Sequence, residues 1–197
     1  MSRSDINYDW VMVRWEPDSR GRLEQAALAL FGELGFDETP VAAIAERAGV
    51  TERTFFRHFA DKREVLFGGG TTFQDAIVAG VRGAGPELSP LAAVAEGFAA
   101  AGEVLQGRRQ FALARSAIIA ANPALQEREL IKLASIAGAV GETLRARGVS
   151  EPDASLAAHV GVAAFHVAFG QWVATANAPV LSELISEAFG RMAALAR

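Results

Sequence analysis

The spacing of the apolar residues constrains the fold of this chain more than any other feature. Apolar side chains recur every three or four residues along almost the whole chain, and no segment alternates apolar with polar residues as a half-buried strand would. The first run covers residues 23–34 and stops at Gly35, the residue type that most often follows the end of a helix. The pattern predicts an all-α fold of about nine helices.

The composition is that of a soluble globular protein. The chain has 197 residues, of which 51% are hydrophobic and 21% charged, and it has no cysteine, which excludes a disulfide framework and a thiolate metal site. Charged residues interrupt segment 1–15, unlike a signal peptide. The most apolar stretch, residues 156–178, contains two histidines, which favours a buried helix over a membrane span. We therefore expect a cytoplasmic protein without a membrane partner.

The net charge of −4 speaks mildly against a nucleic-acid partner. A few phosphate-binding groups on one face can nevertheless outweigh acidic residues that lie farther from DNA than the Debye length of about 8 Å. The charge of the whole chain is therefore a poor test of DNA binding.

Residues 41–59 have the spacing of a helix-turn-helix. A first short helix, with Thr39 as its N-cap, stops at Gly49, where a positive φ lets the chain turn. Thr51 then caps a second helix over residues 52–58, which turns its phenylalanines at 55 and 59 toward the core. A helical hairpin with a polar outer face would show the same pattern, so the spacing alone leaves both interpretations open.

The string AERAGVTERTFFRHF at positions 45–59, followed by Asp61, Lys62 and Val65-Leu66-Phe67, resembles the DNA-binding domain of the TetR (tetracycline-repressor-like) family. The resemblance covers residues 20–67, and the remainder agrees only in length, helicity and number of helices. It implies an N-terminal arm at 1–19, a helix-turn-helix domain at 20–67 and a ligand-binding and dimerisation domain at 68–197.

The resemblance also implies phosphate contacts on either side of the second helix. Thr39 and Thr51 match positions where hydroxyls and helix N-terminal amides bind phosphates. His58 matches a phosphate-contacting position, and Lys62 matches a phosphate-binding lysine.

Three residues of the second helix, Arg53, Thr54 and Arg57, match the face that looks into the major groove. Phe56 departs from the family pattern, since many members have tyrosine there. The change removes a phosphate hydrogen bond. It leaves two alternatives open, an apolar contact with a thymine methyl group or partial burial of the ring.

Two further features of the N-terminal half each have two interpretations. Residues 1–11 are either an annotation artefact ahead of a native start at Met12, or part of an arm whose Arg14 or Arg20 reaches a minor groove. The glycine triplet 68–70 is either a hinge or a simple loop between two helices.

The C-terminal half shows no catalytic pattern. His159 and His166 are seven residues apart, too far for a metal pair on one helix turn, and no glycine-rich phosphate loop follows a strand. We expect no enzyme, no metal and no cofactor.

Aromatic residues in this half, with a few polar groups among them, suggest a cavity for an unknown small-molecule effector. Plain core packing is the alternative for each of them. Arg115 needs a partner when buried, and either an acidic ligand or an internal carboxylate such as Glu103 or Glu142 would serve. The candidate ligand-binding residues are Phe73, Phe98, Phe111, Arg115, Phe165, His166, Phe169 and Trp172.

The resemblance implies a homodimer formed by the last two helices, and hence a palindromic double-stranded DNA operator. The expected function is that of a repressor released by a small apolar or amphipathic effector. The alternatives are a DNA-binding regulator without a ligand and a helical enzyme or ligand carrier. The candidate dimer residues are Ala157, Gly161, Ala164, Ala168, Leu181, Leu184, Ile185, Ala188, Phe189 and Met192.

Overall fold

The computed structural model describes residues 18–68 and 70–195, and within them it contains only helices and their connections, which confirms the all-α prediction. Ten helical segments follow one another, close to the nine expected. They are α1 (Ser19–Leu34), α2 (Val41–Arg47), α3 (Glu52–His58), α4 (Glu64–Phe67), α5 (Gly70–Gly83), α6 (Pro90–Gln106), α7 (Arg109–Ala120), α8 (Pro123–Ala146), α9 (Glu151–Ala174) and α10 (Leu181–Leu195).

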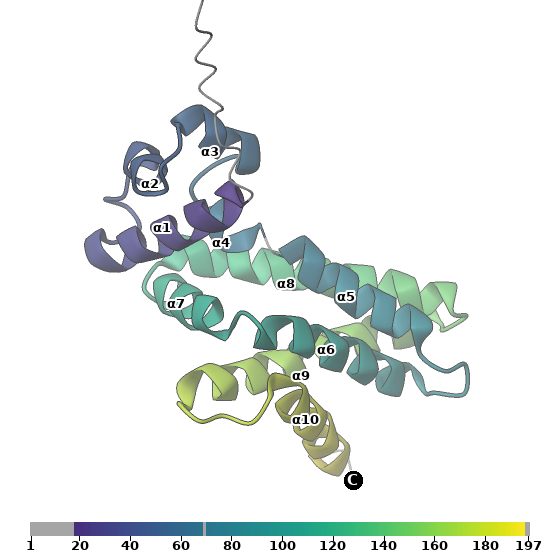
Figure 1. The fold of residues 1–197 in the computed structure, drawn as a ribbon. Coiled ribbons are helices and arrows are strands. Elements are labelled where there is room, and N and C mark those ends of the chain that lie inside the picture. The colour runs from purple at the N-terminus through teal and green to yellow at the C-terminus, as the bar shows by residue number, and fades with distance from the viewer. Residues whose placement is uncertain (1–17, 69, 196–197) are drawn as a thin grey trace, which may run out of the picture.

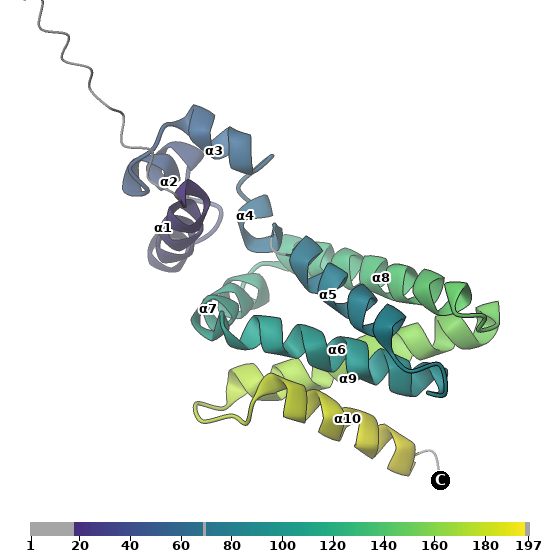
Figure 2. The ribbon, with the colours of Figure 1, turned by 45° about the vertical axis from the view of Figure 1, so that its right-hand side comes forward.

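Helices α1–α4 form a small head at one end of an elongated body built from α5–α10 (Figure 1). In the body, α5 packs along α6, α8 along α9, and α10 against α6 and α9. The same arrangement is visible after a 45° turn of the molecule (Figure 2).

The helix boundaries follow local sequence signals closely. Ser89 and Ser150 cap α6 and α9 by accepting backbone N–H groups, and each of these helices has a proline in its first turn. Gly49 adopts φ +67°, as the expected turn requires. The expected cap of α2 is wrong, because Pro40 occupies the N-cap position and the hydroxyl of Thr39 bonds elsewhere.

Two apolar cores fill the molecule, and the boundary between them does not follow the chain. The core of the head gathers residues of α1–α4 around Phe55 and Leu23, yet it also contains Ile118 and Ile119 of α7 and Leu125 of α8. The body core lies among α5, α6, α8, α9 and α10 and also includes Ala112 of α7. The head is therefore closed from behind by helices of the body.

Helix α9 is long and apolar enough to cross a membrane by length and composition alone, which is weak evidence of a span. One side of it, including Ala154, Ala158 and Trp172, is fully buried in the body core. This side packs as the sequence predicted for a buried helix.

Candidate DNA-binding surface and effector cavity

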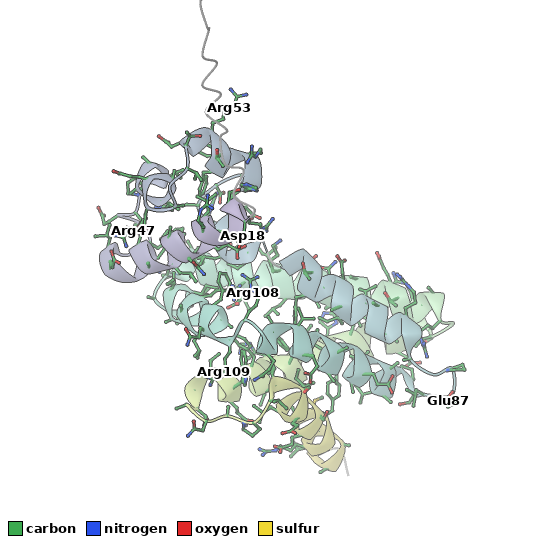
Figure 3. All side chains as sticks on the ribbon, viewed as in Figure 1. Asp18, Arg47, Arg53, Glu87, Arg108 and Arg109 are labelled. Atoms are coloured by element: carbon green, nitrogen blue, oxygen red, sulfur yellow. The ribbon has the colours of Figure 1, made fainter. Side chains whose placement is uncertain are left out.

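Helix α3 is anchored on one side and open on the other. Thr51 caps it by accepting the N–H of Thr54 at 3.2 Å, and Phe55 is fully buried beneath it. The opposite side carries Arg53 and Arg57, both exposed, and Arg53 projects from the tip of the head (Figure 3). The N-terminal half of α3 is thus free to enter a groove, as a recognition helix must be.

Phe56 remains largely outside the fold. Its side chain is 54% exposed, and its ring meets Phe55 edge-on at 5.4 Å between centroids. Of the two alternatives from the sequence, the structure favours an exposed ring on the same face as Arg53 and Arg57.

His58 ends α3 and is partly buried against the start of α1. Its Nε2 lies 2.8 Å from the hydroxyl of Ser19. Burial, together with the charges of Arg57 and Arg20, holds the pKa of His58 below its usual range. The negative charge of a phosphate beside this ring would act in the opposite direction and favour the protonated form.

Two residues with predicted phosphate roles make hydrogen bonds within the fold. Thr39 is fully buried, and its hydroxyl donates to the Gly35 carbonyl at 2.7 Å. The ammonium of Lys62 lies 2.7 Å from the Phe36 carbonyl oxygen, 2.9 Å from that of Asp37 and 3.2 Å from that of Thr39. An ammonium has three N–H groups, and here each has a carbonyl acceptor, so the structure gives Lys62 the role of fixing the α1–α2 turn.

Arg20 likewise belongs to the fold rather than to an arm. It donates to the Gly68 carbonyl at 2.9 Å, pairs with Glu24 and lies over the ring of Phe59. Its side chain is nevertheless 44% exposed, and whether it also reaches a minor groove stays a prediction. The other arm residues of interest, Met12 and Arg14 among them, lie outside the described residues.

The glycine triplet falls at the junction of α4 and α5, with Gly70 as the first residue of α5. Gly68 has ordinary right-handed helical backbone, and a Cβ built there would lie 2.8 Å from the Glu64 carbonyl oxygen and 2.7 Å from Nη2 of Arg20. Close packing therefore requires glycine at 68. Whether the segment acts as a hinge stays a prediction.

A cavity of about 310 Å³ lies where the head meets the body. Its aromatic wall runs from Phe73 of α5 to Phe165 and Phe169 of α9, with neighbouring ring centroids 5.0 and 5.6 Å apart. Leu66 and Phe67, the last two residues of α4, complete it on the head side. The same two residues belong to the core of the head, so the cavity and the DNA-binding domain share a wall.

Six of the eight predicted ligand-binding residues line this cavity: Phe73, Phe111, Arg115, Phe165, His166 and Phe169. Phe98 and Trp172 do not, and both are fully buried in the body core. The sequence missed the contribution of α4 and the polar residues Gln74, Arg108, Ser116, Glu129, Lys132 and Ser135. Gln74 belongs to α5 and the others to α8 and to α7 with its N-cap, and they show only ordinary helical spacing.

Arg115 finds its partner inside the protein. It donates to Glu129 at 2.8 Å and to the Leu66 carbonyl at 2.7 Å, and its guanidinium lies over the ring of Phe67. The internal partner is Glu129, and neither Glu103 nor Glu142 fills this role. Arg115 thereby ties the end of α4 to α7 and α8.

Nine of the ten candidate dimer residues are buried in the core of the single chain, and Met192 is partly buried. The four small residues on α9, Ala157, Gly161, Ala164 and Ala168, let this helix approach its neighbours within one protomer. The exposed side of α9 is instead formed by Leu156, His159, Ala163, Val167 and Gly170, with Leu156 65% and Val167 53% exposed. This stripe contains no Asp, Glu, Lys or Arg.

Comparison with known proteins agrees with this architecture. Residues 24–67 match the model of bacterial regulatory proteins of the tetR family, and residues 88–196 match that of the MftR C-terminal domain. The transcriptional regulator TcmR of Streptomyces glaucescens is 39% identical over 101 residues, which are 50% of this chain and 44% of TcmR. The chain thus matches less than half the length of this relative.

Three solved structures share the fold. A TetR-family regulator from Mesorhizobium loti has a TM-score of 0.59 at 23% identity and covers 89% of this chain and 94% of its own. FadR of Bacillus subtilis with stearoyl-CoA has a TM-score of 0.58 and 19% identity, and the match covers 86% of this chain and 95% of FadR. FadR of Thermus thermophilus with lauroyl-CoA has a TM-score of 0.54 and 23% identity, and the match covers 88% of this chain and 93% of that FadR. The matched family models span both the head and the body, and the chain belongs to the TetR family of transcriptional regulators.

Proposed function

We propose that the protein is a dimeric transcriptional repressor that binds a palindromic operator and is released by a small amphipathic effector in the cavity. One observation carries the proposal: Leu66 and Phe67 are at once part of the core of the head and part of the cavity wall. An effector that pushes on this wall shifts α4, and with it α3. Membership of a family of regulators favours this function over that of a helical enzyme or carrier.

The exposed face of α3 supports the DNA half of the proposal. Arg53 and Arg57 would read or approach base edges, with Phe56 placed for a thymine methyl group. Thr54 would face the groove with the two arginines, and Thr51 and His58 would contact the flanking phosphates. Thr39 and Lys62 would act indirectly, by fixing the α1–α2 turn behind the recognition helix.

Dimerisation would use the exposed stripe on α9 together with α10. The stripe presents Leu156, Ala163 and Val167 to solvent on a helix whose other side is already buried. A second copy of the chain would cover it by two-fold symmetry and set two recognition helices roughly one turn of DNA, about 34 Å, or more apart.

The effector half rests on the lining of the cavity. Most aromatic rings of the lining come from α5 and α9, and its charged and hydroxyl groups come from α7, its N-cap and α8. This combination suits a ligand with an apolar body and a polar end. Two of the structural neighbours are described with bound acyl-CoA, a ligand of this amphipathic kind.

The test is selection of bound duplexes from a random-sequence pool, followed by affinity and stoichiometry measurements on the selected site. We expect an inverted repeat bound by two chains, with binding lost in the double variant Arg53→Ala, Arg57→Ala. Recovery of no preferred sequence, or binding that survives the double substitution, would overturn the assignment of α3 as the recognition helix.

A further inference from the structure

The two walls of the cavity differ sharply in chemistry. The aromatic wall comes from α5 and α9, whereas Arg115 and Ser116 of α7 and Glu129, Lys132 and Ser135 of α8 form a polar wall. The Arg, Lys and Glu side chains of the lining therefore all come from α7, its N-cap and α8, whereas the aromatic wall carries only Gln74 and His166 as polar residues.

Three cationic side chains and one carboxylate line the cavity, and most of this charge is already paired. Arg108 binds Glu24 of α1 and lies over the ring of Phe111 at 4.3 Å. Arg115 holds Glu129, the single carboxylate of the lining, at 2.8 Å.

Lys132 differs from both arginines. It lines the polar wall and is partly shielded from solvent, yet its ammonium has no hydrogen bond or ion pair with any other residue that the structure describes. Glu129 lies one helical turn away on α8, but its carboxylate is directed to Arg115 on α7. A partly desolvated cation without a partner leaves this end of the cavity with an excess of positive charge.

We propose that the effector is an amphipathic anion, whose carboxylate, sulfonate or phosphate group binds Lys132 while its apolar body lies against Phe73, Phe165 and Phe169. Ser116 and Ser135 supply hydroxyl donors on the same wall. A cationic ligand would face three cationic side chains across a cavity whose carboxylate is already bound, so the lining selects against it. This inference rests on the proposed function, in that it assumes an effector site in this cavity.

A matched pair of fluorescent probes isolates the charge. 1-Anilinonaphthalene-8-sulfonate and N-phenyl-1-naphthylamine share one ring framework and differ by the sulfonate group. Both would be titrated into the full-length protein and into the variants Lys132→Met and Lys132→Arg. Arg145→Met is the control, because it removes an exposed cation from the same helix outside the cavity lining.

We expect Lys132→Met to weaken binding of the sulfonate about tenfold and binding of the neutral amine less than about twofold. The two losses differ because only the sulfonate forms an ion pair with Lys132. Lys132→Arg should keep the preference, and Arg145→Met should change neither affinity. A further variant, Ala112→Leu, narrows the cavity and should weaken both probes, which places them inside it.

Equal losses for the two probes in Lys132→Met would show that the lysine only shapes the cavity, and unchanged affinities would show that it does not meet the ligand. Either result overturns the inference, as does failure of the sulfonate to bind in the cavity. None of these measurements involves DNA. Failure of the operator selection would instead overturn the proposed function and leave the charge preference of the cavity standing.

Discussion

The head has two faces that are built in opposite ways. Its front, the exposed side of α3, carries Arg53, Phe56 and Arg57 with little support beyond the Thr51 cap and the buried Phe55. Its rear is closed by Ile119 and Leu125, which come from body helices α7 and α8. The contrast indicates that residues that recognise DNA can change without unfolding the head, whereas its position depends on side chains of the body.

The cationic residues divide in the same way. Arg53 and Arg57 face solvent, while Lys62 and Arg20 bind backbone carbonyls at the ends of helices. The body also uses a cation to bind backbone carbonyls. Arg147 at the end of α8 donates to four carbonyls around the end of α5, the nearest at 2.7 Å. Cations at helix C-termini satisfy carbonyls that have no partner within the helix.

The largest effect should come from the rear face. Leu125→Ala removes a fully buried side chain of α8 from the core of the head, and we expect it to lower the free energy of unfolding by about 2–5 kcal/mol in urea titrations. Leu130→Ala on the same helix, 65% exposed, is the control and should change it by less than about 0.5 kcal/mol. Equal effects would show that α8 does not close the head.

Lys62→Met tests whether this cation serves the fold or the phosphates. It leaves three carbonyls of the α1–α2 turn without their donor, and we expect a loss of about 2 kcal/mol in stability. Operator affinity should fall with no change in its salt dependence. Unchanged stability, with a salt slope reduced by about one charge, would instead support the phosphate contact that family resemblance implies.

Arg57→Ala removes an exposed cation from the front face. We expect operator affinity to fall about tenfold and stability to change by less than about 0.5 kcal/mol, measured by fluorescence anisotropy and urea unfolding. Arg145→Ala, which removes an exposed cation near the C-terminal end of α8, should leave operator affinity unchanged. A loss of stability in Arg57→Ala would contradict the separation of the two faces.

The smallest effect concerns pH. The pKa of His58 is lowered in the folded free protein, so the unfolded chain binds this proton more readily. His58 therefore contributes stability that is present above pH 6.5, and this stability is lost as the pH falls through the lowered pKa. A phosphate contact would raise the pKa in the complex. Operator affinity should then increase about threefold between pH 7 and pH 6, and His58→Gln should remove this increase. An identical pH profile in the variant would argue against the contact.

The sequence by itself determined the elements whose causes are local. The Thr51 cap, the turn at Gly49 and the inward Phe55 each depend on neighbours within a few residues, and all three occur as predicted. Periodicity likewise fixed the all-α class. The aromatic lining of the cavity was also largely predictable, because six of the eight suggested residues reach it.

Only the tertiary structure decided which partner each polar side chain meets. Lys62 bonds carbonyls about 25 residues away, Arg20 reaches Gly68, and Arg115 is shared between Leu66 and Glu129. The same limit applies to α9, where periodicity finds small residues but cannot tell an intramolecular contact from a dimer contact. A pattern along one helix records which side chains share a face, whereas the packing of distant helices determines what that face touches.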